Sequence, residues 1–201
     1  NSFDDIHTWS GVTEFTEHGC AIHVDTGMQR LGLTIEEFEA LKHNVALLNS
    51  LNLKLLISHL SCAEQPQSEV NQQELALFTR LSNGLPGASK SLANSSGVFL
   101  DPAFHFDLCR AGAALYGVNP RPDQNNPMQP VLSVSAPILQ IRQIHQTCSV
   151  GYGATATMLP GSRLATIAAG YADGYPRQAS NLGQVQIGDW LAPVVGKVSM
   201  D

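Results

Sequence analysis

The feature that most constrains this chain is the alternation of short apolar runs with helical patterns over its first two thirds. Helical spacing of apolar side chains predicts helices over 34–50 and 68–83. Apolar runs predict strands over residues 21–25, 53–61, 89–94 and 112–118. Strands that alternate with helices indicate parallel βα units. We therefore expect an α/β architecture built on a parallel sheet in this part of the chain.

The boundaries of the two predicted helices carry their own signals. Thr34 followed by Glu37 is a capping box, in which each side chain bonds the backbone of the other residue. Ser68 is a suitable N-cap for the second helix, and Gly84 is a suitable stop.

The residue composition and the hydrophobic pattern of the sequence change near residue 119. Residues 119–130 are rich in Pro, Asn and Gln, which is typical of a linker. Beyond them, β-branched segments follow one another at short spacing without a helical period, which predicts antiparallel strands. We expect an α/β domain over 1–118, a linker over 119–130 and a small, mainly antiparallel β domain over 131–201.

Composition narrows the possible partners. The net charge is -6 and no cluster of Lys and Arg occurs, so a nucleic-acid surface is not expected. No apolar run reaches the roughly 18 residues of a membrane span, and no secretory signal is recognisable. The 4 cysteines are far apart and form no C-x-x-C motif, which suggests reduced, buried thiols in a cytoplasmic protein.

Polar residues follow the predicted strands. Parallel barrels carry their catalytic and binding residues at these carboxyl ends of the strands. His59 ends one strand, and Asn94 and Ser95 follow another at a point where a phosphate could be held. Arg110 precedes Gly112 and Ala113, small residues that let a ligand approach the backbone. Taken singly, each group also fits an ordinary role as a core histidine, a turn or a packing strand.

The stretch VDTGMQRLG (24–32) places a charged group beside the first strand. His23 and Asp25 share one strand face, Gly27 permits a turn, and Arg30 follows it. A solvated surface arginine is the alternative. Cys20-x-x-His23 and His59-x-x-Cys62 could together supply zinc ligands, but residues three apart on a strand point to opposite faces, so no metal site is expected.

Residues 149–157, SVGYGATAT, contain one tyrosine in an otherwise small and polar segment. Tyr152 lies between Gly151 and Gly153, which remove packing partners and permit unusual backbone geometry. This pattern raises the question of why the chain would expose an aromatic hydroxyl here.

Seven motifs together resemble the alanine racemase family, in the family's own order. They are VDTGMQRLG, SHLSCAE, SLANSSG, CRAGAALYG, VGYGATAT, GYADGYPR and GKVSMD. The resemblance covers residues 21–201 and implies the second half of a TIM-type barrel that binds pyridoxal 5'-phosphate (PLP), then the first part of a C-terminal β domain. It implies PLP-dependent conversion of L-alanine to D-alanine for peptidoglycan, in a homodimer that shares its active sites between subunits.

The resemblance also implies roles for individual residues. Tyr152 matches one of two catalytic bases and reaches into the neighbouring subunit. His59 matches the histidine that hydrogen-bonds this tyrosine, and Arg110 matches the arginine that faces the pyridine nitrogen of PLP. A permanent cation there leaves that nitrogen unprotonated and weakens the cofactor as an electron sink.

The remaining matches concern the cofactor phosphate and the substrate. Asn94, Ser95 and the backbone at Gly112 and Ala113 match the phosphate cradle. Arg30 matches an arginine near the PLP phenolic oxygen and the substrate carboxylate.

The β domain is expected to contribute two further groups. The Met200 backbone N–H would meet the substrate carboxylate from the partner subunit, and Tyr171 would line the entry corridor.

Two departures from the family pattern qualify these expectations. His23 stands where many members have a carbamylated lysine that orients the arginine, so Asp25 or another anion would take over, and serine or broad-spectrum racemase remains an alternative. None of the lysines matches the Schiff-base lysine of the family's first barrel strand, so this chain alone is expected to be an inactive fragment that pairs with a complementary piece or another copy. A non-catalytic PLP carrier is a further alternative, but such carriers lack the β domain and its tyrosine.

Overall fold

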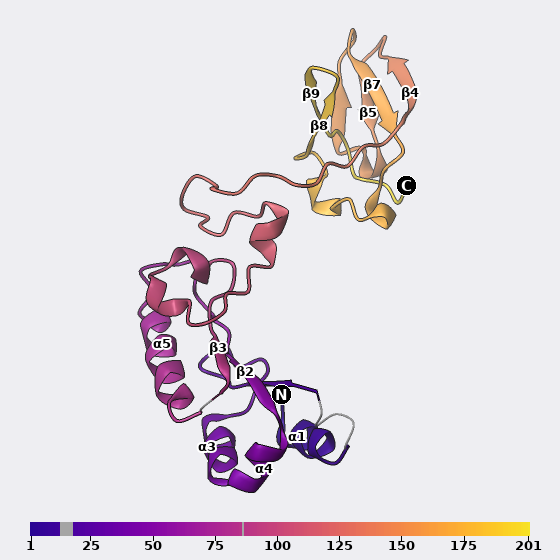
Figure 1. The fold of residues 1–201 in the computed structure, drawn as a ribbon. Helices are drawn as coiled ribbons and strands as arrows, with labels where there is room; N and C mark the ends of the chain where they lie inside the picture. The colour runs from indigo at the N-terminus through magenta and orange to yellow at the C-terminus, as the bar shows by residue number, and fades with distance from the viewer. Residues whose placement is uncertain (13–17, 86) are drawn as a thin grey trace. The chain divides into compact units, whose positions relative to one another are not determined.

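The computed structural model describes residues 1–12, 18–85 and 87–201. The chain divides into two compact units, Asn1–Leu132 and Ser133–Asp201, and each is described here by itself (Figure 1).

A three-stranded parallel sheet forms the centre of the N-terminal unit. Its strands are β1 (Cys20–His23), β2 (Leu53–Ile57) and β3 (Ser89–Ser91), in the order β1-β2-β3. The prediction of parallel strands is confirmed, although β2 and β3 end earlier than expected. The residues that follow them, including His59 and Asn94, therefore lie in loops beyond the carboxyl ends of the strands.

Helices follow the strands, as the sequence pattern predicted. Thr34 and Glu37 form the capping box that begins α3 (Ile35–His43). Asn44 then ends α3 and caps α4 (Val45–Ser50), so the single helix predicted over 34–50 is wrong at this residue. Helix α5 (Glu69–Ser82) occupies almost all of the second predicted helix.

The core of this unit lies between these helices and the sheet. Figure 1 shows α3, α4 and α5 beside β2 and β3. Phe38 and Leu41 of α3, Phe78 of α5, Leu56 of β2 and Leu92 beyond β3 are fully buried in one cluster. Burial of large apolar side chains on both layers is the main favourable contribution to folding, so this core fixes where the ends of the strands lie.

The strand predicted over 112–118 is wrong. Residues Ala113–Tyr116 form a 3₁₀-helix, η3, which Gly117 ends in the left-handed conformation at φ 83°. Short 3₁₀-helices also occur at η1 (Gly97–Phe99) and η2 (Pro102–Phe104). An apolar run of this length does not by itself distinguish a strand from a helical turn, and the tight turn at the end decides against the strand.

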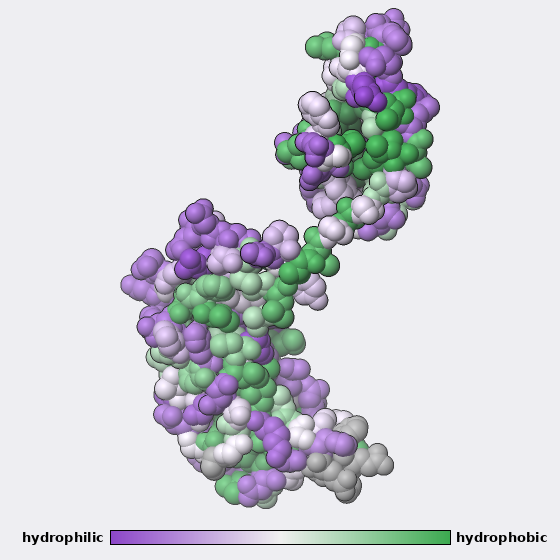
Figure 2. Space-filling model, turned by 45° about the horizontal axis from the view of Figure 1, so that its top comes forward, coloured by the Kyte–Doolittle hydropathy of each residue, from purple (hydrophilic) through white to green (hydrophobic). Residues whose placement is uncertain are grey.

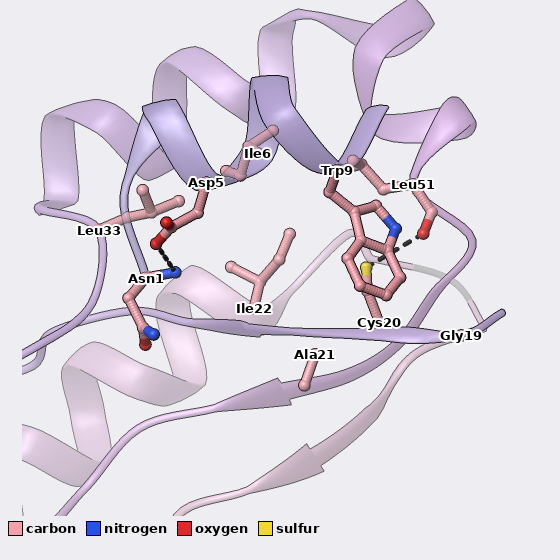
Figure 3. Close-up of a pocket in the computed structure, with 10 residues that line it drawn as sticks. All are labelled: Asn1, Asp5, Ile6, Trp9, Gly19, Cys20, Ala21, Ile22, Leu33 and Leu51. Carbon is pink, nitrogen blue, oxygen red and sulfur yellow. Dashed lines mark hydrogen bonds and ion pairs between the residues drawn. The ribbon is translucent and has the colours of Figure 1, made fainter. Parts of the chain in front are cut away.

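Helix α1 (Phe3–Ser10) packs near β1, and a pocket opens between them (Figure 3). The Cys20 thiol donates a hydrogen bond to the Leu51 carbonyl (3.0 Å) on one side of this pocket. Burial raises the pKa of the Cys20 thiol, so it stays protonated. None of the residues that line the pocket is one of the candidate catalytic, cofactor-binding or substrate-binding residues named above. All four cysteines are free and only half-buried.

The C-terminal unit consists of three antiparallel strand pairs, which confirms the mainly antiparallel prediction. They are β4 (Ile138–Gln143) with β7 (Arg163–Ile167), β5 (Cys148–Val150) with β6 (Ala156–Met158), and β8 (Gln184–Ile187) with β9 (Trp190–Pro193). Three short 3₁₀-helices connect them: η4 (Tyr152–Ala154), η5 (Tyr171–Asp173) and η6 (Arg177–Ala179).

Large apolar side chains of this unit are mostly exposed, and Figure 2 shows hydrophobic residues on its surface. Across residues 133–201, all of which the structure describes, Ile144 is the one large apolar side chain that is buried. In the described part of the whole chain, no helix is both long enough and apolar enough to cross a membrane.

Candidate functional site

Two candidate polar side chains meet beyond the carboxyl ends of β2 and β3. The Asn94 side-chain nitrogen lies 3.4 Å from Nε2 of His59 and donates to the Leu60 carbonyl at 3.1 Å. The Asn94 side-chain oxygen accepts from the Gly97 N–H at 2.9 Å, which fixes the orientation of the amide. Because His59 Nε2 faces a donor, this nitrogen acts as the acceptor, and the proton of the neutral ring is assigned to Nδ1.

Arg110 spans the ends of the same two strands. Its Nη1 donates to the Ser91 carbonyl (3.0 Å) and to the Ser91 hydroxyl (2.5 Å), and its Nη2 donates to the Ser58 carbonyl (2.5 Å). The Arg110 backbone N–H donates to the Ala93 carbonyl at 2.9 Å. The guanidinium is therefore held by neutral oxygens, and no carboxylate of a described residue lies within ion-pair distance of it.

The electrostatics of this region favour neutral histidines. Burial and the nearby charges of Arg110 and Arg30 lower the pKa of His59. Burial and Arg110 also lower the pKa of His23, against a smaller opposing effect of Asp25. Burial lowers the pKa of Arg110 too, but an arginine ordinarily titrates so far above neutral pH that it stays a cation.

The proposed phosphate cradle brings together the loop after β3 and the start of η3. The Ser95 hydroxyl oxygen accepts from the Ala114 N–H at 3.1 Å, so its own hydrogen is available to another acceptor. Gly112 and Ala113 are exposed, and a Cβ added at Gly112 would meet nothing within 4 Å. The backbone therefore leaves open space beside a hydroxyl donor.

The loop after β1 is shaped by its glycines, but it leaves Arg30 exposed and without a hydrogen bond to any described residue. The Asp25 carboxylate accepts from the Gly27 N–H at 2.9 Å. A Cβ at Gly32 would come within 3.0 Å of the His23 ring, so the ring packs closely against this loop.

Tyr152 begins η4 in the C-terminal unit and is 73% exposed. Both flanking glycines have φ 73°, a left-handed region that other residues rarely adopt. A Cβ at Gly151 would lie 3.3 Å from the Lys197 backbone nitrogen, so the segment that carries Tyr152 is seated closely against residues 196–197. The Tyr152 hydroxyl is therefore exposed between two glycines, as the sequence pattern indicated.

Tyr171 and Met200 are brought together in the same unit. The Tyr171 N–H donates to the Ser199 carbonyl (3.0 Å), and the Ala172 N–H donates to the Met200 carbonyl (2.9 Å). The Gly170 position lies against the Met200 backbone too closely for a Cβ. The Arg177 guanidinium lies over the Tyr171 ring at 5.7 Å.

Sequence reasoning missed the groups that hold the candidate residues in place. Ser58 and Ser91 are buried and bind Arg110, but the sequence offers no signal that separates them from any other strand serine. Glu74 of α5 is buried, and both its carboxylate oxygens accept from the Ser61 N–H.

Among the described residues, no three His, Cys, Asp or Glu side chains gather where a metal ion could bind.

Comparison with known proteins gives matches over almost the whole chain. Residues 1–120 match the family model for the alanine racemase N-terminal domain, and residues 131–201 match that for the alanine racemase C-terminal domain. Alanine racemase of Rhodospirillum rubrum is 45% identical over 203 aligned residues, and that of Brucella abortus is 39% identical over 218. Each alignment includes 100% of this chain and 54% of the relative, so the chain spans about half the length of these relatives.

Solved structures agree with the family models. The structure of alanine racemase from Bartonella henselae with covalently bound pyridoxal phosphate has a TM-score of 0.87 and 39% identity, over 100% of this chain and 56% of that one. Biosynthetic alanine racemase from Pseudomonas aeruginosa has a TM-score of 0.78 and 37% identity, over 90% of this chain and 51% of that one. The chain, with its partial barrel and its antiparallel β domain, belongs to the alanine racemase family.

Proposed function

We propose that the full-length protein is a PLP-dependent alanine racemase, which interconverts L-alanine and D-alanine in the cytoplasm and supplies D-alanine for the cell wall. The observation that carries the proposal is the guanidinium of Arg110, held at the ends of β2 and β3 by neutral oxygens. The open backbone at Gly112 follows Arg110 in the chain, and the hydroxyl of Ser95 accepts from the Ala114 N–H just beyond it.

The residues present fit a phosphorylated cofactor. The Ser95 hydroxyl hydrogen is free to donate, and the backbone around Gly112 and Ala113 leaves room for a bulky anion. Ser95 and this backbone would hold the phosphate, with Asn94 positioning the loop through its bond to the Gly97 N–H. Arg110 would meet the pyridine ring nitrogen.

When bound, PLP supplies the electron sink that makes the substrate α-hydrogen acidic. Arg110 would place a permanent cation beside the ring nitrogen. It would not transfer its proton to that nitrogen, because the ordinary pKa of arginine lies far above neutral pH. Holding this charge with neutral acceptors leaves it undiminished, which limits side reactions that need a stronger sink.

Two-sided proton exchange requires a base on each face of the substrate α-carbon. We assign one of them to the phenol oxygen of Tyr152, which is exposed on its own unit and free to enter the site of a second subunit. His59 is kept neutral by burial and by two arginines, and its assigned Nδ1–H can donate to that phenol oxygen. Arg30, the Met200 backbone and Tyr171 would orient the substrate carboxylate and line its approach.

The test is Tyr152→Phe in the full-length protein, followed by deuterium wash-in from D₂O for each alanine enantiomer. Loss of a positioned general base typically costs about 100- to 10,000-fold. We expect this loss for one enantiomer and a much smaller one for the other. The matched control is Tyr116→Phe, which removes the hydroxyl of another exposed tyrosine and should leave both exchange rates unchanged.

Equal losses for the two enantiomers would contradict the assignment of Tyr152 as one of two bases. Absence of racemisation by the wild-type protein with PLP would overturn the proposed function itself. Running alanine and serine in parallel assigns the preferred substrate.

A further inference from the structure

We propose that Ser91 is a positioning residue for Arg110, which selects the edge of the guanidinium that faces a ligand. The inference takes its ligand, PLP, from the proposed function. The hydrogen bonds that support it all lie within this chain. Ser91 is completely buried at the last position of β3, and its hydroxyl lies 2.5 Å from Nη1 of Arg110.

The hydroxyl of Ser91 has a defined direction. It donates its hydrogen to the Leu108 carbonyl at 2.6 Å, so only its lone pairs face the guanidinium. It therefore acts toward Arg110 as an acceptor, and it cannot turn to donate without losing a short bond in a dry environment. Loss of that bond would leave the hydrogen of a buried hydroxyl without an acceptor, which is costly.

The backbone of Ser91 supports the same arrangement. Its carbonyl accepts from the Ser58 N–H (3.1 Å) across the sheet and from Nη1 of Arg110 (3.0 Å). The Ser58 carbonyl binds Nη2, and the Ser58 hydroxyl lies 2.6 Å from that of Thr26. Two backbone carbonyls thus anchor the guanidinium, and the Ser91 hydroxyl gives Nη1 a second acceptor.

Counting the donors shows which edge is left over. A guanidinium carries five N–H groups, two on each Nη and one on Nε. Among the described residues, both oxygens of Ser91 accept from Nη1 and the Ser58 carbonyl accepts from Nη2. None of them accepts from Nε, so the Nε–H is available to a ligand acceptor. Without the Ser91 hydroxyl, Nη1 keeps only the Ser91 carbonyl as an acceptor, and the guanidinium can tilt.

The experiment compares Ser91→Ala with Ser82→Ala in the full-length protein. Ser82 is a matched control because it is equally buried and bonds a backbone carbonyl, that of Thr79, on α5. Two quantities are measured: the nitrogen-15 NMR signals of the Arg110 guanidinium without cofactor, and the dissociation constant of PLP. Ser91→Thr, which keeps the hydroxyl, is the conservative variant, and circular dichroism checks that each variant is folded.

We expect Ser91→Ala to average the separate Nη signals of Arg110 and to weaken PLP binding about tenfold, as loss of one charge-assisted hydrogen bond would. Ser82→Ala should do neither, and Ser91→Thr should restore both. A folded Ser91→Ala protein with wild-type guanidinium signals would overturn the inference, and so would the same losses in Ser82→Ala. If the guanidinium signals respond as expected in a protein that does not racemise alanine, the inference stands and the proposed function fails.

Discussion

Arg110 is half-buried, and the way it is held determines what it can do for a ligand. A buried arginine is ordinarily paired with a carboxylate, because an unpaired charge in the interior is costly. Here its described partners are the oxygens of Ser58 and Ser91, which stabilise the cation without neutralising it. Burial lowers the pKa values of His59 and His23, and the uncompensated charge of Arg110 lowers them further. The partners of Arg110 therefore contribute to keeping both histidines neutral.

The lowered histidine pKa values make stability depend on pH in a definite direction. An unfolded histidine titrates near 6.5, whereas burial holds the pKa of His59 and of His23 below that value in the folded state. Below about pH 6.5 the unfolded chain therefore binds more protons, and the free energy of unfolding falls as pH falls toward the lower folded values. We expect His59→Gln to reduce this fall, measured by urea denaturation at several pH values between 7.5 and 5.

The control for that measurement is His145→Gln, because His145 is exposed in the C-terminal unit. This variant should follow the wild-type pH dependence. An identical fall in stability for wild type and His59→Gln would show that protonation of His59 does not contribute.

At the scale of elements, helix capping offers a second matched comparison. The Thr34 hydroxyl accepts from the Glu37 N–H at 3.2 Å, and the Glu37 carboxylate accepts from the Thr34 N–H at 2.8 Å. Ser68 occupies the same position before α5 but makes no such side-chain bond. We expect Thr34→Ala to lower the free energy of unfolding by about 1 kcal/mol, and Ser68→Ala to change it far less, both read from chemical denaturation. Equal losses would mean that the bonds of the capping box add nothing to the stability of α3.

The elements also show where sequence patterns stop being informative. Helical spacing located α3, α4 and α5, because each packs apolar side chains against the core. It did not locate the break at Asn44, where a side chain that caps α4 also interrupts the preceding helix. It did not distinguish the 3₁₀-helix η3 from a strand, since a short apolar run satisfies both. In this chain, the local sequence predicts which segments pack against the core better than it predicts their backbone conformation.

At the scale of the whole molecule, the limit of prediction is set by distance along the sequence. Arg110 binds Ser58 and Ser91, which are separated from it by 52 and 19 positions. No periodic pattern encodes such contacts, because they depend on which strands become neighbours. The motifs indicated His59, Asn94 and Arg110 through their family resemblance, and the sheet order β1-β2-β3 then explains how two strand ends supply the groups around them.

The division into two units raises the question of which chain supplies Tyr152 to a given site. If the full-length protein is a homodimer with shared sites, a variant of Tyr152 and a variant of Arg110 damage different subunits' contributions to one site. In a mixed dimer of Tyr152→Phe and Arg110→Gln subunits, one site then carries both changes and the other carries neither. We expect mixtures of two inactive variants to regain about a quarter of wild-type activity, since random pairing makes half of the dimers mixed and half of their sites intact. Refolding the two together and assaying racemisation measures this, with each variant refolded alone as the control. If Tyr152 instead serves the site of its own chain, every site in the mixed dimer is damaged, and the mixture stays as inactive as its components.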